Sequence, residues 1–288
     1  MDLKHLVLLA LTLSLILTVF SFGLGATLDD LLYLVRRPGL LARSLLSMFV
    51  VVPLAILGIT AASSFPATVE IWLLALSVSP LPPILPRKMR KGGVRSGYPV
   101  ALLATVSTLS IAIVPLGVDL MGRWFGRPFA MPPSAVAPVM LKMVLLPLFA
   151  GMVVRRLTPG GAARLEKPAG VIGGVVLASA AVILVGSQLQ TLWALVGQGA
   201  MLGILGFAVV GLVAGHLLAG SDVEQQDVLA VSSACRHPGI ALAVATANFP
   251  DGQFGPPIIL YLLVNAILML PYLKWQESRL AAGSRATA

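Results

Sequence analysis

Charged residues are scarce in this sequence. Aspartate, glutamate, lysine and arginine together make up only 11% of its 288 residues, whereas 58% are hydrophobic. The mean hydropathy is +0.96. A soluble domain carries about 25% charged residues. A water-soluble fold of this length could not bury so much apolar surface, so the composition predicts a polytopic membrane protein.

Cysteine is almost absent, and so are the motifs of common enzymes. The single cysteine, Cys235, excludes an intramolecular disulfide framework and a cysteine-cluster metal site. We find no paired intramembrane carboxylates, HExxH, GxSxG or phosphate-binding loop. We therefore expect a protein that is not an enzyme, with no cofactor and no metal site. The net charge of +9 is expected of cytoplasmic membrane loops, so it does not predict nucleic-acid binding.

Long apolar runs are abundant, and they set the number of membrane spans. A transmembrane helix needs about 20 mostly apolar residues. The first run is too long for a signal peptide and lacks a clear cleavage site, so we interpret it as a retained span. The sequence predicts an all-α protein with about nine spans, at residues 4–25, 40–60, 69–86, 98–122, 134–157, 168–187, 191–219, 222–248 and 256–275.

Basic residues fall mainly in alternate loops, and this predicts the orientation. The opposite loops contain little beyond Lys4, Arg123 and Arg127. By the positive-inside rule the N-terminus is outside and the tail at 276–288 is cytoplasmic. The composition is typical of a high-GC bacterium, so we expect a bacterial inner membrane. The alternate-loop residues are Arg36, Arg37, Arg87, Lys88, Arg90, Lys91, Arg95, Arg155, Arg156, Arg164, Lys167, Lys274, Arg279 and Arg285.

Helix caps are predicted at two places outside the apolar runs. In "TLDDLLYLVRRPG", Thr27 can cap a short surface helix that Pro38 ends. Asp29 suits the positive N-terminal end of that helix. The eighth span opens with Ser221 and Glu224 at capping-box spacing.

Two spans are interrupted near the middle of the membrane. The third contains Pro80, Pro82, Pro83 and Pro86, which make a continuous helix nearly impossible. The eighth carries His237–Gly239 after a similar rise from the opposite side. Two broken helices that enter from opposite faces are typical of inverted-repeat secondary transporters, whose site lies where the breaks meet. We predict one transporter domain at 1–275, with a first repeat at about 1–122 and a second at about 134–275.

Three segments make the chain similar to the bile acid:sodium symporter family. They are "FGLGATLDDLLYLVRRPGLL", "LALSVSPLPP" and "SSACRHPGIALAVATANFP". The similarity extends over nearly the whole chain. It implies a core domain with two crossed broken helices, a panel domain, and a substrate between them. It also identifies the nine-span members, with the broken helices third and eighth.

The ion ligands of the family are replaced at the second break. Sodium-coupled members read Glu-x-Gly-x-Gln-Asn there, and the resemblance places Ser232, Arg236 and His237 at the ligand positions. The first break, "PPILPRKM", has no amide or hydroxyl. A hard cation wants several oxygen ligands, and an arginine would repel it. We therefore do not expect sodium coupling of the family's kind, and Na⁺ is not expected as a cofactor.

Several residues are candidates for substrate binding, each with a plainer alternative. Arg236 is expected to lie deep in the membrane at the crossing, facing a cavity, with Ser232 accepting a hydrogen bond from it. It offers a fixed charge for an anionic ligand or a substitute for the absent ion. His237 is a proton carrier or a residue hydrogen-bonded at a helix break. Lys142 is a functional charge or a snorkelling one. The full candidate set is Arg236, His237, Ser232, Ser233, Pro80, Pro82, Thr105, Ser107 and Thr108.

The function predicted from these features is transport of a small organic anion by alternating access. Secondary active and facilitative transport both fit, with sodium coupling not expected. One alternative is a sodium-coupled organic anion symporter that uses other ligands. Another is a membrane receptor or partner subunit that kept the fold without transport. Beyond the substrate, the lipid bilayer is the expected partner.

Overall fold

The computed structural model describes residues 3–86, 89, 93–124, 126, 129–196 and 199–286, without the side chains of 3–5, 8 and 281–286. Arg87, Lys88, Arg90, Lys91 and Arg127, on which the predicted orientation partly rests, lie outside the described residues. So do the side chains of Lys4 and Arg285.

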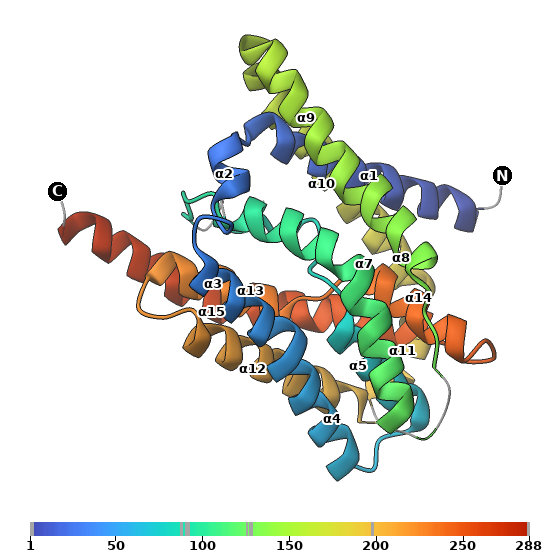
Figure 1. Cartoon of the computed structure of the whole chain (residues 1–288). Helices are drawn as coiled ribbons and strands as arrows, with labels where there is room; N and C mark the ends of the chain where they lie inside the picture. Colours follow the sequence, from blue (N-terminus) through green and yellow to red (C-terminus); the bar gives the residue numbers. More distant parts are fainter. Residues whose placement is uncertain are drawn as a thin grey trace.

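The described part of the chain is helical and contains no strand (Figure 1). The first half holds α1 (Leu3–Gly25), α2 (Leu28–Leu32), α3 (Pro38–Leu46), the π-helix η1 (Ser47–Val51), α4 (Val52–Ala62), α5 (Ala67–Val78) and α7 (Tyr98–Trp124). The second half holds α8 (Pro133–Met140), the π-helix η2 (Leu141–Leu145), α9 (Leu146–Leu157), α10 (Pro159–Ser187), α11 (Leu189–Val196), α12 (Ala200–Leu218), α13 (Val223–Ala234), α14 (Pro238–Asn248) and α15 (Gly255–Ala286).

Seven helical segments in the described residues are long and apolar enough to cross a membrane, and the all-helical membrane fold is confirmed. Two shorter apolar helices, Leu9–Gly25 and Ala67–Val78, fall on the first and third predicted spans. Two long segments are continuous because a π-helix joins their halves: α3 runs through η1 into α4, and α8 through η2 into α9. The exact count of nine spans and the inverted repeat stay predictions.

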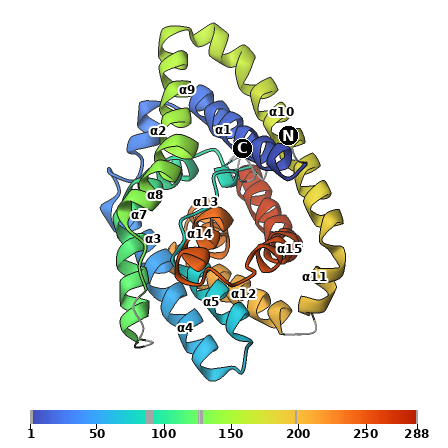
Figure 2. The same cartoon turned by 90° about the vertical axis from the view of Figure 1, so that its right-hand side faces the viewer.

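The predicted boundaries of the sixth and seventh spans are wrong. We predicted one span over 191–219, but residues 189–196 form α11, which continues from the end of α10 along the edge of the molecule (Figure 2). The next helix, α12, begins only at Ala200, after Gly199. Gly199 has a φ of 80°, a left-handed conformation that favours glycine. The turn at Gly199 separates α11 from α12, and it cannot be recognised from the sequence because it lies within an apolar run.

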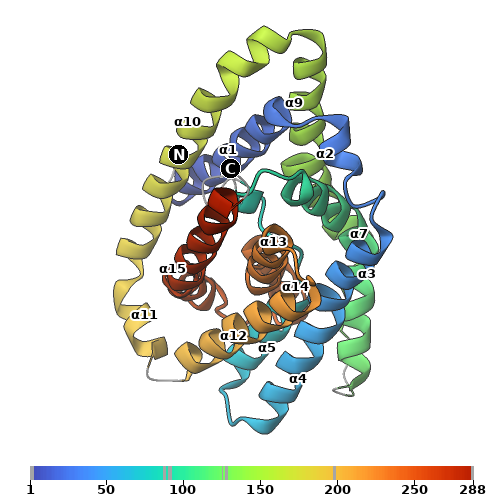
Figure 3. The same ribbon diagram turned by 90° about the vertical axis from the view of Figure 1, so that its left-hand side faces the viewer.

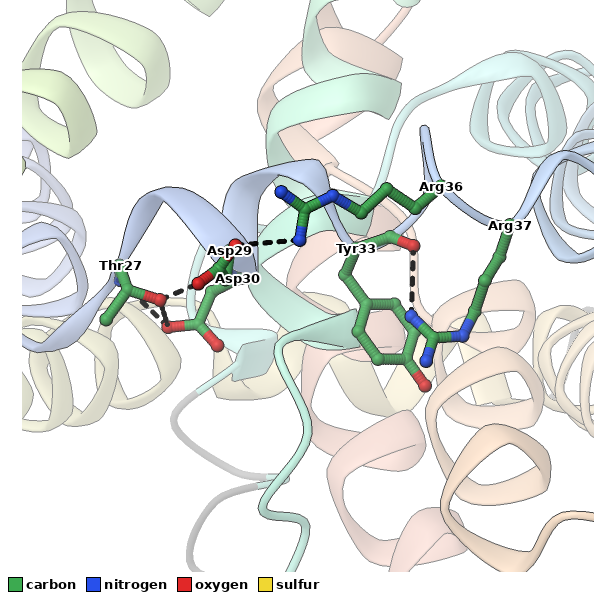
Figure 4. A network of polar contacts seen from close by, with 6 residues as sticks. All are labelled: Thr27, Asp29, Asp30, Tyr33, Arg36 and Arg37. Carbon is green, nitrogen blue, oxygen red and sulfur yellow. Dashed lines mark hydrogen bonds and ion pairs between the residues drawn. The ribbon is translucent and has the colours of Figure 1, made fainter.

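Short-range capping chemistry shapes the segment between α1 and α3. Thr27 caps α2 in a reciprocal capping box with Asp30, and Arg36 pairs with Asp29 at 2.7 Å (Figure 4). We predicted that Pro38 ends this short helix, but Pro38 occupies the first turn of the next helix, α3. The predicted cap of the eighth span is also wrong. The N-cap of α13 is Asp222, whose carboxylate accepts from Gln225 N, rather than Ser221.

The helices form two groups. One group, which we call the panel, consists of α1, α9 and α10, with α1 packed against both of the others. The other group surrounds α13 and α14, which lie at the centre of the molecule (Figures 2 and 3). The apolar window of Val223–Asn248 is 78% buried, compared with 17% for that of α10. The two interrupted helices therefore meet inside protein, as broken backbone at membrane depth requires.

Candidate functional site

The first helix break follows α5. The helix ends at Val78, where Ser79 N–H bonds to the carbonyl of Leu76. Pro80 and Pro82 have no N–H to donate, so the helical ladder cannot continue. The backbone beyond Val78 is extended at Ser79, which is fully buried. The predicted break is confirmed, and it leaves buried carbonyls that need donors from elsewhere.

The second break separates α13 from α14 at Cys235, Arg236 and His237. We predicted an interruption at His237–Gly239, but the helix already resumes at Pro238. Proline suits the first helical position because its φ is pre-set and its missing N–H is not needed there. His237 is the N-cap, and its Nδ1 accepts a hydrogen bond from Ile240 N at 3.4 Å.

The two breaks touch. The backbone N–H of His237 donates to the carbonyl of Pro80 at 2.7 Å. Nη1 of Arg236 donates to the carbonyl of Ser79 at 3.4 Å. The third and eighth spans therefore cross where each helix is interrupted, as predicted. The donors of one break satisfy the acceptors of the other.

Arg236 is fully buried at this crossing. Its Nη2 donates to the carbonyl of Met48 at 2.5 Å, in the π-helical turn η1, and its Nη1 bonds to Ser79. The ring of Phe49 lies 5.9 Å from the guanidinium carbon. Both acceptors are backbone carbonyls, and Ser79 lies at the C-terminal, negative end of α5. The charge is held by dipoles of the protein.

Two finer predictions about Arg236 are wrong. The guanidinium does not project into an open cavity, because it is packed between the carbonyls of Met48 and Ser79. Ser232 does not accept from it, and the buried Oγ of Ser232 has no hydrogen-bond partner. The carbonyls of Met48 and Ser79 are far from Arg236 in sequence but lie within hydrogen-bond distance of it, and they take the place of the Ser232 hydroxyl. The expectation that Arg236 avoids the lipid headgroups holds, since none of it is exposed.

The remaining candidates divide between the crossing and its surroundings. Ser233 bonds to Ser47 Oγ at 2.7 Å and so ties α13 to η1. On α7, which packs against α13, Ser107 is fully buried. Thr108 is exposed and bonds to Ala104 O of its own helix, and Thr105 is half-buried. Among the three predicted hydroxyls of α7, only Ser107 is fully enclosed in the interior.

Several buried polar atoms of α7, α13, α15 and the second break lack a partner. These atoms are Ser107 Oγ, Ser232 Oγ, Arg236 Nε, His237 Nε2 and Asn265 Oδ1. Buried polar groups in native proteins nearly always have a partner, which is protein, ordered water or a ligand. These atoms include both donors and acceptors that no described protein group engages.

Sequence reasoning missed the contribution of α15. The hydroxyl of Tyr261 accepts from Arg236 N at 2.7 Å, and Asn265 Nδ2 lies 3.2 Å from Cys235 Sγ. These two residues stand four apart in "YLLVN", so they share one face of α15 within a stretch that is otherwise apolar. A polar pair on one face of a span is a signal that could have identified them.

In the described part of the chain, no group of three or more His, Cys, Asp or Glu side chains is arranged so that it could hold a metal ion. A cavity of about 330 Å³ lies elsewhere, between α5, α7 and α14, and its lining includes Glu70, Phe129 and Asn248. Arg236 does not line it.

Two comparisons relate the chain to known proteins. Residues 12–195 match the model of the sodium bile acid symporter family. The chain is also similar to a Bacillus subtilis (strain 168) protein named as the uncharacterized sodium-dependent transporter YocS. The two are 24% identical over 299 residues, which cover 96% of this chain and 87% of the relative.

Proposed function

The chain belongs to the sodium bile acid symporter family, and from this premise we propose that it carries an organic anion by alternating access without sodium as the coupling ion. It is an integral membrane protein of a transporter family. The panel and the central helices are the two bodies that would move. The N-terminus would lie outside a bacterial inner membrane and the C-terminus in the cytoplasm.

One observation carries the proposal. The guanidinium of Arg236 lies between the carbonyls of Met48 and Ser79, at the point where the two broken helices cross. Carbonyl oxygens at a break are the ligands that coordinate Na⁺ in transporters with broken helices. Arg236 is a permanent cation that already occupies one such carbonyl, that of Ser79, and a second carbonyl in η1, that of Met48, so it satisfies the same electrostatic need. It would also repel a second cation.

The buried position of Arg236 decides which of its two predicted roles we favour. Both Nη atoms of Arg236 donate to backbone carbonyls, which leaves Nε as its only nitrogen without a hydrogen-bond partner. We propose that it replaces the ion and that its field favours an anion nearby. The direct ligands would be donors that still lack a partner, which include the hydroxyls of Ser107 and Ser232, Nε2 of His237 and Nε of Arg236 itself. Hydroxyl and N–H donors suit the oxygens of a carboxylate.

Sodium-coupled symport through other ligands is the second candidate function, and two observations favour it. The Bacillus subtilis relative is named as sodium-dependent. The unpaired oxygens of Ser107, Ser232 and Asn265 are of the kind that a hard cation prefers. The two candidates differ in a single measurable requirement, which is the need for sodium.

The test measures uptake into proteoliposomes with sodium replaced by choline. Cholate and butyrate serve as a large and a small organic-anion probe. We expect the wild type to take up at least one of them equally well in both salts. A wild-type rate that collapses in choline would contradict the sodium-free proposal and leave the sodium-coupled one. Uptake of neither probe in either salt would count against organic-anion transport.

The matched variants are Arg236→Gln and Arg164→Gln. The first removes the buried cation, and the second removes an exposed one on α10. Hydrogen bonds to a charged group are worth about 1.5–3 kcal/mol each. Uptake in choline should therefore fall at least ten-fold in Arg236→Gln and stay unchanged in Arg164→Gln. A folded Arg236→Gln protein with wild-type uptake in choline would refute the role of Arg236.

A further inference from the structure

A groove runs along the panel between α1 and α9, and the proposed function does not use it. Two hollows of about 460 Å³ each follow one another along α9, the first beside α1 and the second beside the turn from α1 to α2. The first is lined by Lys142 of η2 and otherwise by apolar residues, which include Leu17 and Phe20 of α1 and Leu146 of α9. The second extends past Phe149 and Val153 to the end of α9, where the lining becomes basic.

The groove faces away from the central helices. Val19 and Phe22 of α1, together with Leu148 of α9, are buried in the cluster that joins the panel to the central helices. The groove side chains lie on other faces of the same helices. Leu146 is 60% exposed and Val153 54% exposed. In a membrane protein, an exposed apolar face at this position contacts acyl chains.

Two arginines lie at the end of the groove. Arg155 and Arg156 occupy the last turn of α9 and line the second hollow. Arg155 is half-buried and donates from Nη1 to the carbonyl of Leu24, near the end of α1, at 3.3 Å. Arg156 is exposed.

No carboxylate in the described part of the chain forms an ion pair with either arginine. The nearest acids along α2 are engaged elsewhere, because Asp29 pairs with Arg36 and Asp30 caps α2 (Figure 4). Both guanidinium groups therefore keep donors for an anion from outside the protein.

We propose that this groove binds one anionic phospholipid. Its phosphate would lie at Arg155 and Arg156, and an acyl chain would lie along Phe149, Leu146 and Phe20. Guanidinium groups match phosphate oxygens in geometry and charge, and basic pockets beside transmembrane helices bind acidic headgroups.

The length of the groove fits this ligand. From Arg156 back to Leu146 the helix rises ~15 Å over ten residues. The hydrocarbon core of a bilayer is ~30 Å thick, so one leaflet contributes ~15 Å, which equals this rise. Free phosphate would use only the basic end and leave the apolar hollow without a ligand.

A bound lipid would bridge the turn after α1 and the end of α9. Thr27 and Leu28 line the basic hollow on one side, and Arg155 and Arg156 on the other. The lipid should therefore raise the stability of the panel, because a ligand that binds only the folded state stabilises it. This inference does not depend on the proposed function, since lipid binding is measured without any substrate.

The experiment uses native mass spectrometry and thermal unfolding of the full chain in detergent. Phosphatidylglycerol and phosphatidylcholine with identical acyl chains are added as an equimolar mixture. We expect the wild type to retain one phosphatidylglycerol in preference to phosphatidylcholine and to melt at a higher temperature with the former. Arg156→Gln should lower the preference about five-fold, whereas Arg164→Gln, which removes an exposed charge outside the groove, should not.

Further arms separate the lipid from a simple anion. Inorganic phosphate and glycerol phosphate should give no comparable rise in melting temperature, and Phe149→Ser should weaken lipid retention without removing a charge. Equal retention of both lipids by the wild type would overturn the proposal. So would an unchanged preference in Arg156→Gln, or a phosphate effect as large as that of phosphatidylglycerol.

Discussion

Tyr261 connects the last span to the broken eighth span at the scale of a single residue. Its hydroxyl accepts from the backbone N–H of Arg236, a donor that the helix break leaves without a helical partner. Its ring packs edge-on against Trp72 and Phe207. The side chain thus combines a large apolar contact with one polar bond, which is the usual role of a buried tyrosine.

We predict that Tyr261→Phe destabilises the protein by about 1–3 kcal/mol, because a buried N–H loses its acceptor while the ring contacts remain. Thermal unfolding in detergent measures the change. Tyr33→Phe is the matched control, since its stacking on Tyr98 and its contact with Arg37 need only the ring. Equal melting temperatures for Tyr261→Phe and the wild type would show that the bond contributes little.

The polar residues of this site were only partly accessible from the sequence. Arg236 and His237 stand out because ionisable residues in a membrane span are rare and costly. Met48 offers no such signal, because it takes part through its carbonyl rather than its side chain. From the sequence we predicted that the guanidinium of Arg236 donates to Ser232, whereas it donates to the carbonyl of Met48. Reasoning along one helix favours a neighbour one turn away.

At the scale of elements, the close approach of α12 and α13 positions the second break. A methyl group added to Gly211 would collide with the backbone of Ala234 and Ser233 at the end of α13. Gly215 approaches Leu229 and Ala230 in the same way. Small residues let membrane helices approach closely where no hydrophobic force drives them together. The register of α13, and with it the place of Arg236, depends on this contact.

Gly211→Ala should therefore destabilise the protein by about 1–3 kcal/mol, because overpacking forces two backbones apart. Gly206→Ala on the same helix is the control, since its nearest neighbour is the flexible end of Ile59 at 3.8 Å. That change should be neutral or slightly stabilising, because alanine is the better helix former. Melting temperatures of both variants, measured in one detergent, check the prediction. Similar losses for both would argue against a close helix contact.

At the scale of the whole molecule, the charge pattern and the fold together predict a topology. Ser63 lies in the exposed connection between α4 and α5, and Arg36 lies in the exposed turn before α3. These sites stand at opposite ends of one membrane-spanning segment, Pro38–Ala62. From the positive-inside rule we predict that Arg36 lies in the cytoplasm and Ser63 outside.

We predict that a membrane-impermeant maleimide labels Ser63→Cys in intact cells and labels Arg36→Cys only after lysis. The background should be low because the native cysteine, Cys235, is buried. Each variant needs one substitution at an exposed position, so the fold should be unaffected. Labelling of Arg36→Cys alone in intact cells would reverse the orientation.

The sequence by itself determined the membrane class, the helical fold and the presence of a break in both helices, although the second break lies at Cys235–His237 rather than at His237–Gly239. These follow from composition and from proline chemistry, which act within a few residues of the chain. Only the tertiary structure decided what meets at the breaks. Arg236 is held by carbonyls of Met48 and Ser79 and by the hydroxyl of Tyr261, which come from three other segments. Backbone carbonyls are the same in every residue, so only packing selects which of them a buried cation reaches.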